Sequence, residues 1–277
     1  MSTIRKIGQA FIGLILAAFC ALMFGTVVVR RSNDVLWAFG SFRLTVMGAG
    51  VGLSVLTMLA FANAWIGVRN RQDPNGMCPG RFWNGIGFGF LPAAAVWKTF
   101  EMSSPMSQGF PAPTGFWGIP YVIKDCEWMP TRIELAAALI LFTILVIWLM
   151  LRKRDVPENG DLVGLSLTLY SAVRLLSGDL RVRHIDVLGG TTSTGLIALG
   201  VMACVMIWWI VRFIRKGVSP SYALACVPIF VISAGCILMI QDQRLLNGNP
   251  KAMAIVEITF ALLLIKSVVC AGRVGRS

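Results

Sequence analysis

A tyrosine and two arginines lie within a largely apolar stretch of the sequence, LTLYSAVRLLSGDLR at residues 167–181. Tyr170, Arg174 and Arg181 follow one another at spacings of four and seven residues. These spacings are close to whole turns of an α-helix, so the three side chains lie on nearly one face.

An arginine within a membrane span costs about 2.5–3.5 kcal/mol on insertion scales, so it faces a partner, a cavity or a lipid headgroup. Guanidinium groups suit phosphate oxygens because they offer paired donors in one plane. The pattern predicts a phospholipid headgroup site. The structural alternative is that Arg174 snorkels to the interface or pairs within the protein.

A second group of charged residues lies at the ends of two other apolar stretches. Lys98 and Glu101 end the third predicted span and are three residues apart, on one helical face if the helix persists. Arg132 and Glu134 open the fourth. A buried Glu101 or Glu134 carboxylate can act as a base, because burial raises a carboxylate's proton affinity. The alternative for this group is a structural salt-bridge network.

The composition predicts the fold class that must position these residues. Of 277 residues, 56% are hydrophobic and 14% are charged, and the mean hydropathy is +0.74. Apolar runs longer than a soluble core helix needs predict an integral membrane protein. We expect an all-α, polytopic membrane helix bundle of about eight transmembrane helices, forming a single domain over residues 1–277. The expected spans are residues 9–29, 44–68, 82–97, 133–151, 162–177, 192–211, 222–240 and 252–271. The third and fifth are short, so their ends are expected in the protein interior.

The positions of the basic residues predict the topology. Arginines and lysines at residues 152–154, 212–216 and 273–276 mark cytoplasmic loops, and eight spans then place both termini in the cytoplasm. The pair Arg30–Arg31 lies in a loop that this topology places outside, so it does not follow the same pattern. The net charge of +12 is spread over short loops, which excludes a nucleic-acid surface and suits anionic lipid headgroups.

The only sizeable loop, residues 98–132, is rich in proline and aromatic residues. Proline prevents helix continuation, and aromatic rings suit the headgroup boundary. We expect this outward-facing loop to cap the candidate site. Its alternative role is an interfacial anchor without contact to a substrate.

The remaining candidates for chemistry are few. No CxxC or Cys/His set is present, so no zinc site, structural disulfide or cofactor is predicted. His184, the single histidine, is either a proton acceptor or a solvated loop residue. Glu257 and Lys266 lie on opposite faces of the last span and are expected to pair with other helices.

Several stretches resemble the prolipoprotein diacylglyceryl transferase family. They are LPAAAVWKTFEM at residues 91–102, EWMPTRIELAAALILFTILVIWLMLRKR at 127–154, the tyrosine–arginine segment at 167–181 and FWGIPYVI at 116–123. The resemblance covers about residues 83–212. It implies transfer of a diacylglyceryl group from phosphatidylglycerol to the lipobox cysteine of a preprolipoprotein. It also implies a site at the outer face of a bacterial cytoplasmic (inner) membrane.

The resemblance assigns roles residue by residue. The family's lipid-binding tyrosine and arginine match Tyr170 and Arg174, and its later arginine matches Arg181. Lys98 stands where the family has an essential arginine, and Glu101 where it has an asparagine. The resulting candidates are, for catalysis, Glu101, Glu134 and Arg174, and for substrate binding, Lys98, Arg132, Tyr170, Arg174 and Arg181.

Two other interpretations follow from the positions at which this sequence differs from the family's motifs. Met47 and Met129 stand where the family has histidines, and Glu134 and Leu135 where it has tyrosine and glutamate. The chain is therefore also consistent with a catalytically silent relative that binds anionic phospholipid or a membrane protein partner. A third interpretation is an unrelated transporter whose arginine face passes an anionic solute.

Overall fold

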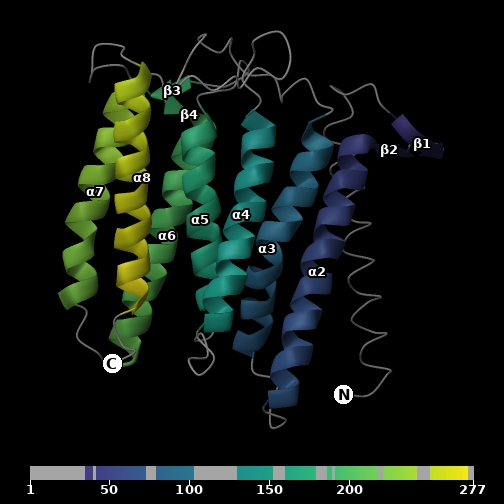
Figure 1. Ribbon diagram of the computed structural model, residues 1–277, viewed down its shortest axis with the longest axis horizontal. Coiled ribbons are helices and arrows are strands. Elements are labelled where there is room, and N and C mark those ends of the chain that lie inside the picture. Colours follow the sequence, from purple (N-terminus) through teal and green to yellow (C-terminus); the bar gives the residue numbers. More distant parts are fainter. Residues whose placement is uncertain are drawn as a thin grey trace. The chain divides into compact units, whose positions relative to one another are not determined.

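The computed structural model describes residues 35–39, 42–72, 79–102, 130–151, 160–178, 186–188, 191–217, 221–241 and 250–273. Within these residues the fold consists of seven helices and two short hairpins (Figure 1). The helices are α2 (Val46–Gln72), α3 (Pro79–Glu101), α4 (Pro130–Leu151), α5 (Asp161–Gly178), α6 (Ser193–Arg215), α7 (Ser221–Gln241) and α8 (Pro250–Arg273).

Five of the described helices, α2, α4, α6, α7 and α8, are long and apolar enough to cross a membrane. Their apolar segments run for 19 to 23 residues, and about 20 are needed to span the hydrocarbon core. The protein is therefore a helical, multi-pass membrane protein. The number eight stays a prediction, because the expected span at residues 9–29 lies outside the described residues. The expected third and fifth spans form helices, α3 and α5, that are not among the five.

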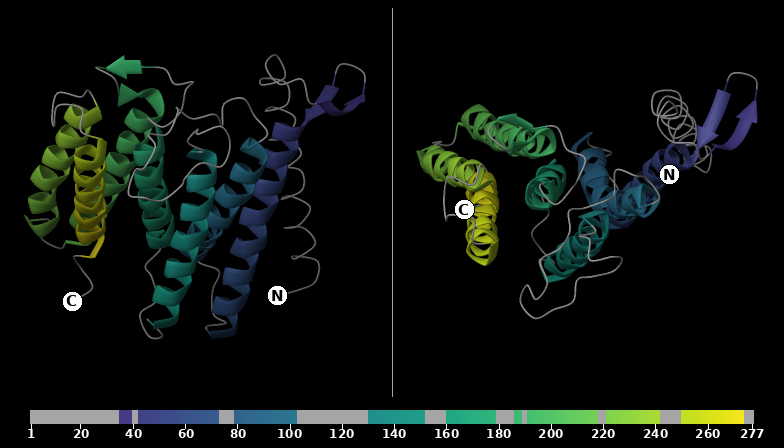
Figure 2. Two further views of the ribbon diagram at one scale, coloured as in Figure 1. Left: turned by 45° about the horizontal axis from the view of Figure 1, so that its top comes forward. Right: turned by 90° about the horizontal axis from the view of Figure 1, so that it is seen from above.

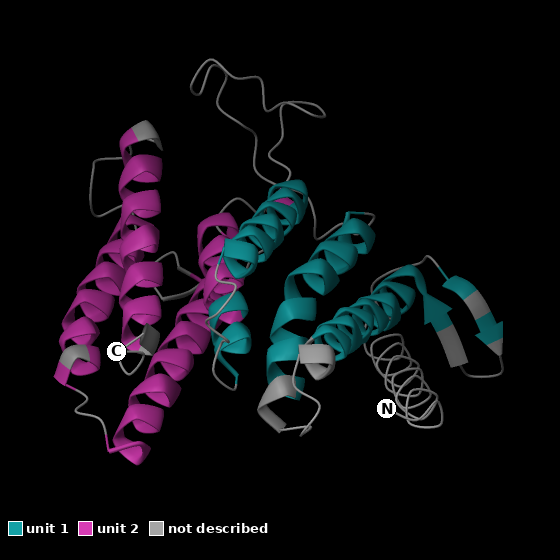
Figure 3. Ribbon diagram, turned by 60° about the horizontal axis from the view of Figure 1, so that its bottom comes forward, with its two compact units in different colours: residues 1–107, 131–166 teal, residues 108–130, 167–277 magenta. Residues whose placement is uncertain are grey.

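The chain divides into two compact units, shown in different colours in Figure 3. The first comprises residues 1–107 and 131–166, and the second comprises residues 108–130 and 167–277. The boundary falls within α5, so its first turns belong to the first unit and the remainder to the second. The expectation of one membrane domain stays a prediction.

In the first unit, glycines bring α3 against two neighbouring helices. A Cβ at Gly89 would lie 2.3 Å from the carbonyl oxygen of Met58 on α2, and one at Gly87 would lie 2.2 Å from the backbone nitrogen of Val163 on α5. Such approach is possible only without a side chain. The Ser166 hydroxyl donates to the Gly87 carbonyl at 2.7 Å. These contacts place α3 between α2 and the first turns of α5.

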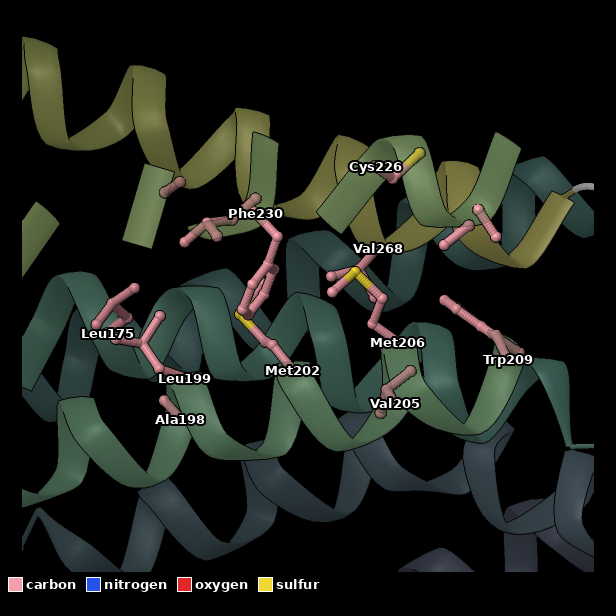
Figure 4. Packing of buried hydrophobic residues seen from close by; sticks show 14 of the residues in the cluster. Leu175, Ala198, Leu199, Met202, Val205, Met206, Trp209, Cys226, Phe230 and Val268 are labelled. Carbon is pink, nitrogen blue, oxygen red and sulfur yellow. The ribbon is translucent and has the colours of Figure 1, made fainter. Parts of the chain in front are cut away.

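The second unit has an apolar core formed by α6, α7, α8 and the last turns of α5 (Figure 4). The buried residues of α6 recur about every three or four positions, so they form the one face of the helix that packs on the core. The buried side chains of this core include Leu175, Met202, Trp209, Phe213 and Phe230. The opposite faces of these helices carry exposed apolar residues, as expected where lipid replaces water.

Two antiparallel hairpins precede helices and were not predicted. The first pairs β1 (Val35–Phe39) with β2 (Phe42–Thr45), and the second pairs β3 (Asp186–Leu188) with β4 (Thr191–Thr192). Figure 2 shows the first hairpin extending beyond the N-terminal end of α2. From the sequence, most of both hairpins was expected between spans, and Leu44, Thr45 and Thr192 were included in the spans that follow, because span hydropathy does not detect strands of five residues or fewer.

Each hairpin ends on a threonine that caps the following helix. Thr45 Oγ1 accepts a hydrogen bond from the Gly48 amide at 3.1 Å, and Thr192 Oγ1 accepts one from the Gly195 amide at 3.1 Å. Both hydroxyls satisfy an amide that has no partner within the first helical turn. The hairpins therefore define where α2 and α6 begin.

Candidate functional site

Three charged side chains meet inside the first unit, at the end of α3 and the start of α4. The Lys98 ammonium donates to Glu101 Oε2 at 2.5 Å and forms a second ion pair with Glu134 Oε2. Lys98, Glu101 and Glu134 are 2%, 7% and 0% exposed. We call these three residues the Lys98 triad.

The local sequence explains how the triad forms. The helix α3 persists to Glu101, so Lys98 and Glu101 lie three residues apart on one face, as expected. The helix α4 begins at Pro130, a residue suited to a first helical position because it lacks an amide hydrogen. Glu134 follows in the second turn and reaches Lys98 across the two helices.

The electrostatics of the triad bear on what it can do. Buried charges must be paired, because desolvation of an isolated ion costs far more than its contacts return. Here one ammonium is shared by two carboxylates that are shielded from solvent. This arrangement is a buried salt-bridge network, and the catalytic roles of Glu101 and Glu134 stay predictions.

The neighbouring residues of α4 differ in their environment. Arg132, a predicted substrate-binding residue, is exposed and does not share the burial of the triad. The Thr131 hydroxyl is buried and has no hydrogen-bond partner among the described residues. Sequence analysis did not single out Thr131, because a threonine at a helix start is commonplace.

The predicted headgroup residues Tyr170 and Arg174 lie on α5 in the second unit. The helix is continuous through both residues, so they are one turn apart on one face, and both are half-buried. Arg181 and His184 lie outside the described residues, as does most of the loop at residues 98–132. Convergence of the tyrosine–arginine pair with the Lys98 triad on one site stays a prediction.

Sequence reasoning also missed two polar contacts between α3 and α5. The Asn84 side-chain oxygen accepts a hydrogen bond from the Leu162 amide at 3.1 Å, which satisfies a donor at the start of α5. Ser166 bonds to the Gly87 carbonyl one helical turn further on. The signal available in the sequence was polar residues inside apolar spans, which membrane helices use to join one another. These contacts anchor the start of the helix that carries Tyr170 and Arg174.

Neither a family model nor a curated protein nor a solved structure matches this chain. No described residues form a group of three or more histidine, cysteine, aspartate or glutamate side chains that could hold a metal ion. The class established by the fold is a multi-pass helical membrane protein with a buried ion triad and a half-buried tyrosine–arginine pair. The resemblance to the diacylglyceryl transferases stays a prediction from the sequence motifs.

Proposed function

We propose that this membrane protein binds an anionic phospholipid, phosphatidylglycerol in the first instance, through Tyr170 and Arg174. We further propose that it transfers the diacylglyceryl group of this lipid to a cysteine thiol of a preprolipoprotein. The observation that carries the proposal is the pairing of a phenol and a guanidinium one turn apart on α5, both half-buried. A guanidinium in this environment binds a phosphate through two parallel hydrogen bonds. The motif resemblance supplies the reaction.

The chemistry follows from the bonds exchanged. The acceptor thiol loses its proton to a base, and the thiolate attacks the glycerol carbon that bears the phosphate ester. The carbon–sulfur bond forms as the carbon–oxygen bond breaks, and glycerol phosphate leaves with the electron pair. Cations stabilise the negative charge on the leaving phosphate. Arg174 has this role first, with Lys98, Arg132 and Arg181 as further cations.

The proposed base is Glu101 or Glu134. Both carboxylates form ion pairs with Lys98. When Lys98 releases one of them to bind a lipid phosphate, that carboxylate becomes able to accept the thiol proton. The proposal therefore couples lipid binding at Lys98 to release of the base.

A second candidate function is lipid or partner binding without catalysis. It is favoured by the burial of both carboxylates on Lys98 and by methionines at the positions of the family's histidines. In this case the triad joins α3 to α4, and the tyrosine–arginine pair holds a lipid permanently.

The two candidates are separated by a transfer assay with purified protein in liposomes. The liposomes contain phosphatidylglycerol labelled in its acyl chains, and a lipobox-cysteine peptide is the acceptor. We expect the wild-type protein to label the peptide, Arg174→Ala to abolish transfer, and Arg174→Lys to impair it, because a point charge cannot bind phosphate bidentately. Lys266→Ala, at an exposed cation on α8, is the matched control and should transfer normally.

Full transfer by Arg174→Ala would refute the headgroup role of Arg174. Absence of transfer by the wild-type protein, with lipid still bound in an Arg174-dependent manner, would reject catalysis and support the second candidate.

A further inference from the structure

The helix α6 has an exposed apolar face that runs along its length. Its core face packs within the second unit through residues such as Met202, Met206 and Trp209 (Figure 4). On the opposite face Ile197, Ile207 and Trp208 are 66%, 57% and 39% exposed. Cys204 and Val211 complete this face, which we call the α6 stripe: Ile197, Cys204, Ile207, Trp208 and Val211. On a helix that can span a membrane, such a stripe is a surface for lipid acyl chains.

The α6 stripe ends in a cluster of cations. Trp208, Arg212 and Arg215 are spaced four and three residues apart, so they share one face of the helix. The guanidinium carbon of Arg212 lies 5.4 Å from the centre of the Trp208 ring, a cation–π contact. Arg215 and Lys216 are exposed beside it. The apolar stripe therefore leads directly to the three cations. This order matches that of a phospholipid, in which the acyl chain is followed by the headgroup.

The backbone at this end of α6 carries the negative end of the helix dipole, which the nearby cations Arg212 and Arg215 offset. The Lys216 amide donates to the carbonyls of Arg212 and Phe213, both at 3.1 Å, and the Gly217 amide donates to the Ile214 carbonyl at 3.0 Å. Gly217 has a φ of 70°, a left-handed conformation that ends the helix. These bonds occupy carbonyls that carry the negative end of the helix dipole. The helix itself has no acidic residue.

We infer that Trp208, Arg212, Arg215 and Lys216 form a binding site for an anionic glycerophospholipid, whose acyl chain lies along the α6 stripe. The occupant follows from charge and position: a negative headgroup meets three cations at the end of a membrane-length apolar surface. Planar guanidinium groups bind the phosphate, and the indole lies at the headgroup boundary, where its amphipathic ring is favoured.

This site is separate from the proposed headgroup site of Arg174. The end of α5 lies beside the start of α6, since a Cβ at Gly178 would lie 2.8 Å from Thr192 Oγ1. From Thr192 to Arg212 the helix rises by about 30 Å, the thickness of the hydrocarbon core. The two sites therefore face opposite leaflets, and neither proposal depends on the other.

The test uses the quenching of tryptophan fluorescence by lipids brominated on the acyl chain near the headgroup. The full-length protein is reconstituted in phosphatidylcholine bilayers that contain brominated phosphatidylglycerol or, in parallel, the same fraction of brominated phosphatidylcholine. The contribution of Trp208 is the difference between the wild-type protein and Trp208→Phe. We expect phosphatidylglycerol to be enriched near Trp208 by about fivefold per contributing cation.

The control variant removes an equal charge elsewhere. Arg212→Gln and Arg215→Gln, made singly, should each lower the enrichment of phosphatidylglycerol near Trp208 by about fivefold, whereas Lys266→Gln, at an exposed position on α8, should preserve it. Equal quenching of Trp208 by the two lipids would overturn the proposal. An equal loss in Lys266→Gln would also overturn it, because the effect would then reflect net charge rather than this site.

Discussion

Removal of the ammonium from the Lys98 triad should destabilise the protein strongly. The three residues are at most 7% exposed, and their formal charges sum to −1. Lys98→Met leaves two buried carboxylates facing one another without this cation. Breaking a buried ion pair in this way costs about 3–5 kcal/mol. Glu101→Gln leaves the Lys98–Glu134 pair with balanced charge and should cost less, about 1.5–3 kcal/mol for the lost charge-assisted hydrogen bond.

A triple replacement should rescue the stability lost in Lys98→Met. Replacement of all three residues by methionine removes the buried charges together, and apolar residues of similar volume should restore stability to near the wild-type value. The measurement is the free energy of unfolding in detergent micelles titrated with SDS, followed by far-UV circular dichroism. Lys266→Met, at an exposed site, is the control and should change stability by no more than about 0.5 kcal/mol. If Lys98→Met unfolded at the same SDS fraction as the wild-type protein, the assignment of Lys98 as a buried, paired cation would be wrong.

Two further predictions concern helix packing and capping. Gly89→Ala places a Cβ 2.3 Å from the Met58 carbonyl oxygen, so α2 and α3 must separate; we expect a loss of about 1–3 kcal/mol in the same SDS titration. Gly67→Ala, where nothing lies within 4 Å, should be neutral or stabilising, and comparable losses in both variants would contradict the packing argument. Thr192→Val removes the hydroxyl that caps α6 and should cost about 0.5–2 kcal/mol, with a matching loss of amide-exchange protection at Gly195. Unchanged protection at Gly195 would show that this cap does not hold the helix start.

The sequence predicted the helices of the described region closely. The expected span at residues 162–177 corresponds to α5 (Asp161–Gly178), and that at 252–271 corresponds to α8 (Pro250–Arg273). The prediction for α3 was less accurate: the expected span, residues 82–97, is shorter than the helix, which runs from Pro79 to Glu101. Hydropathy marks only the apolar part of such a helix, and the polar residues at its end, Lys98 among them, continue it.

The candidate site was predicted only in part. Local spacing was sufficient to place Lys98 beside Glu101, and Tyr170 beside Arg174, because each pair lies on one helix. A salt-bridge network among Lys98, Glu101, Arg132 and Glu134 was one of the alternatives, but local spacing did not identify the Lys98–Glu134 pair itself, since these residues are 36 positions apart and on different helices. The polar contacts of Asn84 and Ser166 with the backbone of a second helix were missed for the same reason.

The amino-acid sequence by itself determined that this chain forms apolar helices of membrane length, because hydropathy and helical period are properties of consecutive residues. Only the tertiary structure decided which face of each helix is buried. The glycines of α3 admit α2 and α5 at backbone contact. At the end of α3, Lys98, Glu101 and Glu134 are buried together, whereas Arg132, only two residues from Glu134, is exposed. The physical reason is that burial of a polar side chain depends on a partner supplied by another helix, and no local pattern encodes the rotation that brings the two together.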